Sequence, residues 1–390
     1  MDVAAIQAAL REASVDGWLF YDHHHRDPLA ARILGLSPSA HVTRRWYYFV
    51  PAMGDPSKLV HRIEPASLDS LPGAKAEYSS WQELEAGLEA MLSGATHIAM
   101  QYSPRNAILY VSMVDAGTVD LVRSFGKEIV SSANLVSQFE AVLTDAQIDT
   151  HYVAQQKIDD ILTAAWPYIG SQVRGSSSIN EFAISSWLGD ALRREGLVWE
   201  HGPNVSAGPN SADSHYEPTA ARSRVIKNGD FLLIDIWGKL DRPGAIFYDI
   251  TWTGVIGREP SEREQQIFAT VRDARDAAIK TVSDAFAANK PIAGFEADDA
   301  ARGVIQRAGF GDRFVHRTGH NIGEDIHGSG AHLDNLETHD IRRILPKTCF
   351  SVEPGIYLTG DFGVRSEINM ITSPGKAVVT GRVQTELVRI

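Results

Sequence analysis

The stretch from His316 to Gly330, HRTGHNIGEDIHGSG, restricts the fold of this chain more than any other part of its sequence. It holds three histidines among four glycines. Each glycine inside a helix costs roughly 1 kcal/mol relative to alanine, so a helix that would place His320 and His327 on one face is disfavoured. A strand would send these two residues to opposite faces, because side chains alternate along a strand and seven is odd. The histidines can therefore meet only through a bend that the glycines permit.

Two aspartates lie within apolar segments that are typical of neighbouring strands. Strand alternation places Asp235 on one face of residues 230–238, and it places Asp249 and Thr251 together on one face of residues 245–257. The segment KLDRPG between them predicts a hairpin, which would bring the two aspartates side by side. Like charges among apolar neighbours need a cation, which is either an arginine in a salt bridge or a metal ion.

Two glutamates occupy similar apolar segments near the C-terminus. In residues 349–358, alternation places Glu353 on the face opposite the apolar side chains, and in residues 363–371 it places Arg365 and Glu367 together on one face. Four carboxylates and one histidine suit Mn, Co, Fe or Zn better than copper or an iron–sulfur cluster. From these residues alone, a dinuclear hydrolase and a set of ordinary salt bridges are both open, since two metals that share carboxylates can activate a water for hydrolysis.

The overall charge narrows the range of partners. The chain has 390 residues and a formal net charge of -12. This argues against a nucleic-acid or anionic-membrane surface, because both need basic patches; we expect peptides or other small molecules instead. We expect neither a signal peptide nor a membrane span, since the first residues are charged and no apolar run approaches about 20 residues. A cytoplasmic location follows as the expectation, and the single cysteine, Cys349, excludes an intramolecular disulfide.

The order of the predicted elements indicates two domains with a boundary near residue 145. The elements expected before the boundary are a helix over 3–13 and strands over 17–22, 44–51 and 97–103. Those expected after it, besides the strands described above, are helices over 145–169, 177–196, 261–286 and 295–309. The first domain is therefore expected to be α/β. Within it, His23 to His25 are interpreted as a solvated loop, with a metal site as the alternative.

Five motifs in a fixed order resemble one known family. IDIWG, YDITWTG, TGHNIGEDIHG, VEPGIY and GVRSE are similar to motifs of the pita-bread metallopeptidases, the family of methionine aminopeptidase, aminopeptidase P and prolidase. The resemblance runs from residue 150 to the end. It implies an α+β fold in which residues 146–390 form a pita-bread catalytic domain and residues 1–145 form a smaller creatinase-like α/β domain. The separate N-terminal domain, GVRSE and the segment ADSHYEP favour the proline-specific branch.

The resemblance implies a complete set of metal ligands. These are Asp235, Asp249, His320, Glu353 and Glu367. Asp249 and Glu367 would bridge two divalent cations, for which Mn or Co is expected and Zn is an alternative. Glu353 would also act in catalysis by moving a proton. A homodimer is implied as well.

Four further residues are implied on the substrate side. His215 and His327 would be catalytic and would bind substrate, and His316, four residues before the histidine ligand, would be a third substrate histidine. Arg365 would bind substrate. For two of these residues a structural role is the alternative: His316 as a packed histidine, and Arg365 as a partner of Glu367.

The function implied is that of an Xaa-Pro dipeptidase, or prolidase, which hydrolyses the bond before proline in dipeptides. We expect Arg365 to pair with the free carboxylate of such a dipeptide. The alternative within the family is aminopeptidase P, an Xaa-Pro aminopeptidase that acts on longer peptides. The alternative outside it is a metal-free binding protein or a creatinase-like hydrolase, which would lack several ligands.

Three positions depart from the family pattern. The two aspartates are fourteen residues apart instead of eleven, which implies extra hairpin residues, with or without a β-bulge. Tyr248 precedes the second aspartate where a small residue is common, and Gly328 follows His327 where an acidic residue is common. None of these departures removes a ligand.

Overall fold

The computed structural model describes residues 1–175 and 178–390. The chain divides into two units, an N-terminal unit of residues 1–140 and a C-terminal unit of residues 141–390. The predicted boundary near residue 145 corresponds to the first residue of helix α6 (Asp145–Arg174). The assignment of residues 1–145 and 146–390 as separate domains stays a prediction.

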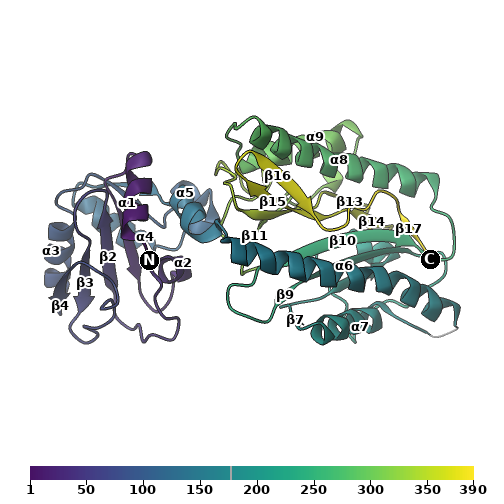
Figure 1. The fold of residues 1–390 in the computed structure, drawn as a ribbon, viewed down its shortest axis with the longest axis horizontal. Coiled ribbons are helices and arrows are strands. Elements are labelled where there is room, and N and C mark those ends of the chain that lie inside the picture. The colour runs from purple at the N-terminus through teal and green to yellow at the C-terminus, as the bar shows by residue number, and fades with distance from the viewer. Residues whose placement is uncertain (176–177) are drawn as a thin grey trace. The chain divides into compact units, whose positions relative to one another are not determined.

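The N-terminal unit is built on a six-stranded sheet with the order β4-β3-β2-β1-β5-β6 (Figure 1). Its strands are β1 (Gly17–Asp22), β2 (Trp46–Pro51), β3 (Ser57–His61), β4 (Ala74–Tyr78), β5 (His97–Met100) and β6 (Glu128–Ser131). Strand β2 pairs antiparallel with β1 and β3, and all other neighbours pair in parallel. The carboxyl ends of the five parallel strands therefore lie at one end of the sheet.

Helices of the N-terminal unit cover both faces of its sheet. They are α1 (Val3–Glu12), α2 (Pro28–Leu34), α3 (Trp81–Met91), α4 (Ala116–Ser124) and α5 (Ala133–Val136), with the short turns η1 (Pro104–Asn106), η2 (Leu109–Val111) and η3 (Ser137–Ala141). Side chains of β1 alternate between two apolar clusters. Trp18 and Phe20 pack with residues of α1 and α2, whereas Leu19 and Tyr21 pack with residues of α3 and α4. All six residues of β1 are buried for this reason.

The described residues of the C-terminal unit form three sheets. Their orders are β17-β10-β9-β7, with β8 also paired to β9, then β11-β12-β15-β16, and β13-β14. The strands are β7 (Leu197–Val198), β8 (Asn204–Ala207), β9 (Phe231–Leu240), β10 (Tyr248–Val255), β11 (Asn321–Ile322), β12 (Cys349–Val352), β13 (Gly355–Tyr357), β14 (Gly363–Arg365), β15 (Ile368–Ser373), β16 (Lys376–Thr380) and β17 (Val388–Arg389).

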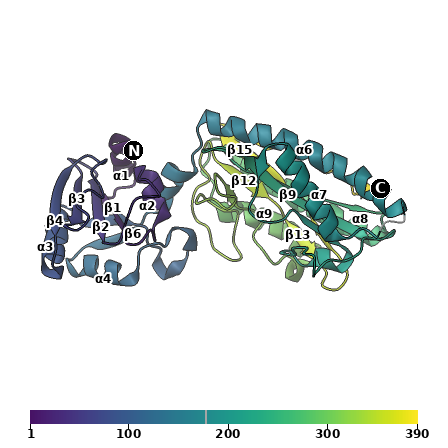
Figure 2. The same cartoon turned by 90° about the horizontal axis from the view of Figure 1, so that it is seen from below.

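Two pairs of helices enclose these sheets (Figures 1 and 2). Besides α6, they are α7 (Glu181–Arg194), α8 (Glu262–Ala287) and α9 (Gly294–Arg307), with the turns η4 (Gly208–Ala212) and η5 (Gly311–Arg313). One apolar cluster joins α6 and α7 to β8, β9 and β10, and a second joins α8 and α9 to β12, β13, β14 and β15. The sheets therefore lie between two apolar layers.

Capping residues explain where the long helices begin. Thr144 and Gln147 form a capping box at the start of α6, and Ser261 and Glu264 form another at the start of α8. The helix predicted over 177–196 begins later, at Glu181, because the Asn180 side chain accepts from the third helical N–H. The first residue of that predicted range, Ser177, lies outside the described residues.

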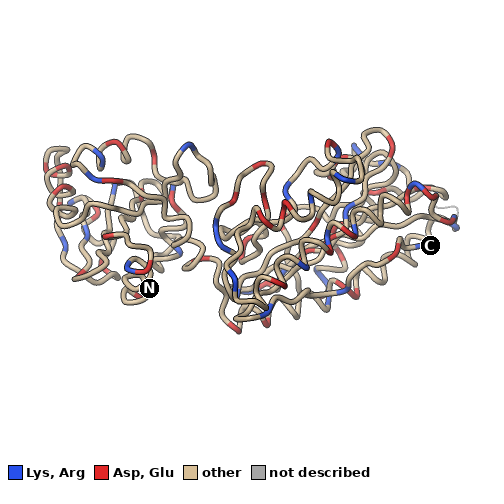
Figure 3. Tube along the Cα trace, turned by 90° about the horizontal axis from the view of Figure 1, so that it is seen from above, with Lys and Arg blue, Asp and Glu red and all other residues tan. Residues whose placement is uncertain are grey.

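Charged residues are interspersed along the trace of each unit (Figure 3). No helix among residues 1–175 and 178–390 is long and apolar enough to cross a bilayer.

Candidate metal centre

The two predicted aspartates come from the two strands of one hairpin. Strands β9 and β10 pair antiparallel through eight successive residue pairs, in which Asp235 lies opposite Thr251 and Asp249 lies opposite Trp237. Both carboxylates therefore project from the same face, two positions apart along the ladder. Because this register is continuous, the extra residues lie in the connection at 241–247. The sequence was compatible with a β-bulge in this hairpin, and these eight residue pairs contain none.

The other three predicted ligands lie at the ends of strands in the neighbouring sheet. His320 precedes β11, Glu353 follows β12 and Glu367 precedes β15. Because β12 and β15 pair antiparallel, Glu353 and Glu367 come one register step beyond their last residue pair. The N–H of Glu367 donates to the carbonyl oxygen of Thr251 at 3.2 Å, which joins this sheet to the hairpin.

Three of the predicted ligands converge closely. Asp249, His320 and Glu367 are buried, and each offers a ligand atom within 4.8 Å of the other two. The Nε2 of His320 lies 3.7 Å from Asp249 Oδ2 and 3.3 Å from Glu353 Oε1. The hairpin and the neighbouring sheet thus place four of the five predicted ligands around one point.

A threonine joins the fifth predicted ligand, Asp235, to this group. The hydroxyl of Thr251 lies 2.8 Å from Asp235 Oδ1 and 2.7 Å from Glu367 Oε2, and it accepts from Arg365 Nε at 3.0 Å. A hydroxyl carries one proton, so it can donate to only one of the two carboxylates. The second close pair of oxygens therefore needs either a protonated carboxyl group or a cation nearby.

Two buried carboxylate oxygens in this group have no hydrogen-bond partner among the residues that the structure describes, namely Asp249 Oδ1 and Glu367 Oε1. Burial, and after it the neighbouring carboxylates, raise the pKa of both groups well above the usual range. Burial also lowers the pKa of His320 to about 3, so its imidazole is neutral. Carboxylate oxygens without partners and a neutral imidazole are the donors that a divalent cation requires. The residues present therefore fit a metal ion.

Arg365 supplies positive charge beside the carboxylates. Its guanidinium forms a buried ion pair with Asp235 through Nη2 and Oδ2, and Nη1 donates to Ser214 O at 3.3 Å. Among the residues that the structure describes, no hydrogen bond or ion pair joins Arg365 to Glu367. Arg365 therefore has a structural partner, as the alternative role requires, but that partner is Asp235 instead of Glu367. The assignment of Arg365 to substrate stays a prediction.

The glycine-rich stretch makes the bend that its composition predicts. The rings of His320 and His327 lie 4.4 Å apart at 87°, and the N–H of Gly328 returns to β11 with a hydrogen bond of 2.8 Å. A Cβ on Gly319 would lie 2.0 Å from the carbonyl oxygen of Ser351, so only glycine lets the strands pass this closely. Both histidines are thereby held at the centre.

The other two predicted histidines come from separate segments. His316 is half-buried, with Nε2 at 2.7 Å from Tyr357 Oη and Nδ1 at 2.7 Å from Arg317 O, and burial lowers its pKa to about 4. These contacts fit the packed-histidine alternative. His215 is exposed after η4, where its N–H donates to Asp213 Oδ1 at 3.2 Å. The substrate roles of both histidines stay predictions.

Two polar residues that were not predicted from the sequence hold the predicted ligands in place. The Ser351 hydroxyl donates to Glu353 Oε1 at 3.0 Å and accepts from the N–H of His320 at 3.0 Å. The Asn369 side-chain oxygen accepts from the N–H of Asp249 at 2.9 Å. Strand alternation places Ser351 on the face of Glu353 and could have identified it. The role of Asn369 depends on a contact between two sheets, and no pattern in the sequence indicates such a contact.

Comparisons with known proteins agree with this geometry. The model of metallopeptidase family M24 matches residues 151–374. "Probable dipeptidase PepE" of Mycobacterium tuberculosis is 26% identical over 343 residues, which cover 87% of this chain and 84% of that protein. The Xaa-Pro dipeptidase of Lactobacillus helveticus is 34% identical over 173 residues, 44% of this chain and 42% of that protein. Two Mycoplasma relatives are matched over about half of their length, 52%.

A solved structure shows the same fold across both units. The dipeptidase PepE from Mycobacterium ulcerans superposes with a TM-score of 0.70 at 23% identity, covering 99% of this chain and 96% of that one. The α+β pita-bread fold predicted from the motifs is confirmed.

Proposed function

The chain belongs to metallopeptidase family M24, and from that premise we propose that it is a dinuclear-metal Xaa-Pro dipeptidase that hydrolyses the peptide bond before proline. The observation that carries this proposal is the pair of partnerless buried oxygens of Asp249 and Glu367 beside the neutral His320. The relatives named as dipeptidases support the substrate class. Proline-containing dipeptides and other short peptides are the proposed substrates.

Two divalent cations would be held by the five predicted ligands, Asp235, Asp249, His320, Glu353 and Glu367. Asp249 and Glu367 would serve both ions, because each has one oxygen that no protein group engages. We propose Mn or Co, with Zn as the alternative, because the donor set is rich in carboxylates. When bound, such ions supply Lewis acidity and make a water acidic enough to serve as the nucleophile near neutral pH.

Glu353 is positioned to move a proton. Its Oε1 accepts from the Ser351 hydroxyl at 3.0 Å and lies 3.3 Å from His320 Nε2, so that oxygen is held in place. The side chain is 13% exposed, which leaves it open to a substrate. Glu353 would take a proton from the attacking water and deliver it to the leaving proline nitrogen.

Imidazoles on the substrate side would stabilise the developing charge. The close ring of His320 lowers the pKa of His327, so His327 is neutral and can donate a hydrogen bond. We propose that His327 and His215 donate to the oxyanion of the tetrahedral intermediate. His316 and Arg365 would complete the substrate pocket, His316 through the ring nitrogen that contacts Tyr357.

One observation favours aminopeptidase P activity as the second candidate. The sequence predicts that Arg365 selects dipeptides, but the structure pairs its guanidinium with Asp235. A free proline carboxylate would have to compete with that buried carboxylate. A metal-free binding protein or a creatinase-like hydrolase is disfavoured, because all five ligand positions hold the expected residue types.

We further propose that the protein is a homodimer and acts in the cytoplasm. The homodimer rests on the family resemblance, and light scattering of the purified chain tests it. Twice the mass of one chain is expected, and the mass of a single chain would contradict it.

Activity of metal-loaded protein on Ala-Pro, Ala-Pro-Ala and Met-Ala-Ala tests the proposed function. We expect the highest kcat/KM for Ala-Pro and none for Met-Ala-Ala. A preference for Ala-Pro-Ala would assign the chain to aminopeptidase P. Cleavage of Met-Ala-Ala alone would contradict both proline-directed candidates.

A further inference from the structure

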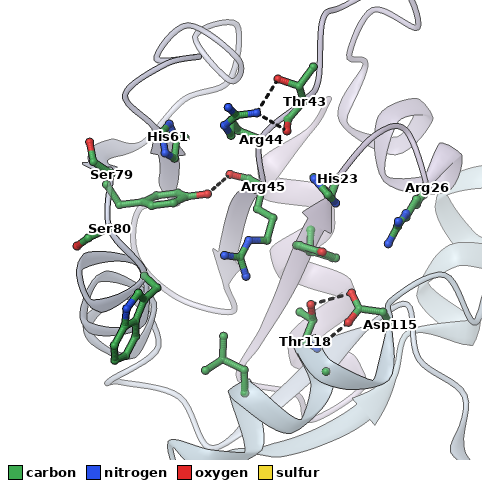
Figure 4. A pocket seen from close by; sticks show the side chains of 15 residues that line it. His23, Arg26, Thr43, Arg44, Arg45, His61, Ser79, Ser80, Asp115 and Thr118 are labelled. Atoms are coloured by element: carbon green, nitrogen blue, oxygen red, sulfur yellow. Dashed lines mark hydrogen bonds between the residues drawn. The ribbon is translucent and has the colours of Figure 1, made fainter.

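A cavity of about 610 Å³ lies within the N-terminal unit (Figure 4). Its lining residues come from the last residues of β1, β3 and β4, from the segment before β2, and from the first turns of α3 and α4. This places the cavity at the carboxyl ends of the parallel strands. The chain order reverses between β1 and β5. The cavity lies on the β1 side of that point, and open α/β sheets bind ligands outside the carboxyl ends of their strands.

The cavity carries positive charge that the protein itself does not neutralise. Its charged lining residues, histidines aside, are Arg26, Arg44, Arg45 and Asp115. Both oxygens of Asp115 are engaged at the start of α4, by the N–H of Thr118 at 2.9 Å and by its hydroxyl at 2.8 Å. Arg45 forms no ion pair with any described carboxylate, and its backbone carbonyl oxygen accepts from the Tyr78 hydroxyl at 2.7 Å. In Figure 4 the Arg45 side chain extends into the middle of the cavity.

Aromatic rings supply the apolar part of the lining. Tyr21, Tyr78 and Trp81 all line the cavity. Trp81 is 63% exposed, although it is the first residue of a regular helix. His61 packs edge-on against Tyr78, with the ring centres 4.9 Å apart. An exposed indole can stack on a flat ring, and a nearby guanidinium can form paired hydrogen bonds with a carboxylate or phosphate.

The loop from His23 to Arg26 is preformed on one side of this cavity. Asp22 Oδ1 accepts from the N–H groups of His23 at 2.7 Å, Arg26 at 2.8 Å and Asp27 at 3.2 Å, which fixes the turn. His23 and Arg26 line the cavity, whereas the next histidine, His24, is exposed. The histidine motif is therefore in part a wall of the cavity and in part the solvated loop that was predicted.

We propose that this cavity binds a small organic anion that carries a planar ring. Its carboxylate or phosphate pairs with Arg45, and its ring stacks on Trp81. The volume fits the range of about 300–1,000 Å³ that is typical of small-molecule sites. The proposal does not depend on peptidase activity, because every residue it uses lies in the N-terminal unit.

Calorimetric titration of the full chain tests the proposal with five probes. Adenosine 5′-monophosphate and indole-3-acetate combine a ring with a phosphate and a carboxylate, respectively. Ribose 5-phosphate and acetate are anions without an aromatic ring, and adenosine is a ring without charge. We expect one of the ring-bearing anions, or both, to bind once per chain with a Kd of roughly 1 mM or lower. We expect the other probes to bind at least about tenfold more weakly, because each lacks one of the two contacts.

Matched variants locate the binding. Arg45→Gln should weaken it by about tenfold or more, since a charged hydrogen bond is lost. Trp81→Ala should weaken it similarly, whereas Trp81→Phe should retain it because a ring remains. Arg11→Gln removes the same charge from the exposed side chain that donates to Ala52 O at 2.8 Å, and should change nothing.

Which ring-bearing anion binds distinguishes phosphate from carboxylate as the group recognised. The proposal is overturned if no ring-bearing anion binds, if the anions without rings bind equally well, or if Arg45→Gln and Trp81→Ala leave binding unchanged.

Discussion

At the scale of single residues, the metal centre depends on two carboxylate oxygens that the protein leaves without partners. Asp249 Oδ1 and Glu367 Oε1 are buried and accept no hydrogen bond from any described residue. Leaving a buried acceptor unpaired costs about 1–3 kcal/mol, and more when the group is charged. Burial and neighbouring carboxylates also raise the pKa of both groups. A divalent cation would offset this penalty, because it binds the ionised form.

Removing Glu367 should therefore remove metal. We expect Glu367→Ala to lower the affinity for Mn by at least about 10- to 100-fold, which is the loss typical of removing an outer partner of a metal ligand, and to abolish activity. Elemental analysis after loading and dialysis measures this. The control is Asp241→Asn, in the exposed hairpin connection, which should keep its metal. If Asp241→Asn lost its metal instead, Asp235 would not be the first ligand.

Truncating Arg365 should lower the rate of hydrolysis of dipeptides and tripeptides alike. The Arg365 guanidinium pairs with buried Asp235, and breaking such a pair typically costs about 3–5 kcal/mol. We expect Arg365→Ala to lower kcat/KM for Ala-Pro and Ala-Pro-Ala by similar factors, because Asp235 would be misplaced for both. Steady-state kinetics with the two substrates measures this. A loss confined to Ala-Pro would support the role predicted from the sequence, in which Arg365 binds the free carboxylate.

At the scale of elements, alternation along strands predicted which side chains share a face. The period of a strand is two whatever its partner, so Asp249 and Thr251 could be assigned to one face before their register with Asp235 was known. Contacts between separate sheets left no comparable signal. The ion pair of Arg365 with Asp235 and the hydrogen bond from the N–H of Asp249 to Asn369 Oδ1 are of this kind.

Within the glycine-rich stretch, the backbone of a neighbouring strand passes so close to Gly319 that a side chain there should not be tolerated. A Cβ there would lie 2.0 Å from Ser351 O, so Gly319→Ala should lower the free energy of unfolding by about 1–3 kcal/mol or more. Gly323→Ala is the control, because its Cβ would meet only Asp325 O at 3.9 Å. Urea unfolding of both variants measures the difference. Equal stability of the two variants would show that the backbone can move apart at Gly319.

Helix α6 carries a buried histidine that should make stability depend on pH. His151 bonds to Phe247 O at 2.7 Å and Thr380 Oγ1 at 2.8 Å, and burial lowers its pKa to about 4. The folded state therefore binds fewer protons than the unfolded state between pH 4 and about 6.5. The contribution of neutral His151 to the free energy of unfolding is complete above that pH window and is lost as the pH falls through it.

The variant His151→Gln isolates this pH dependence of stability. Between pH 7 and pH 5, we expect the wild type to lose about 2 kcal/mol of unfolding free energy relative to His151→Gln. Urea unfolding at several pH values measures the difference. His201→Gln, at an exposed position in the same unit, should follow the wild type. Parallel pH profiles for the wild type and His151→Gln would contradict the buried, neutral assignment.

At the scale of the whole molecule, the order of the motifs predicted the family, and the match over residues 151–374 confirms it. The ligand types could be predicted because each lies in a short motif. The cavity of the N-terminal unit could not, because Tyr21, Arg45, His61 and Trp81 come from four segments that only the strand order brings together.

Metal dependence of Ala-Pro hydrolysis tests the central claim most directly. Protein stripped by a chelator and then titrated with Mn should regain activity and reach a plateau at two equivalents per chain, because the five proposed ligands, with two shared carboxylates, would hold two ions. Full kcat/KM for Ala-Pro in rigorously metal-free protein would contradict the claim.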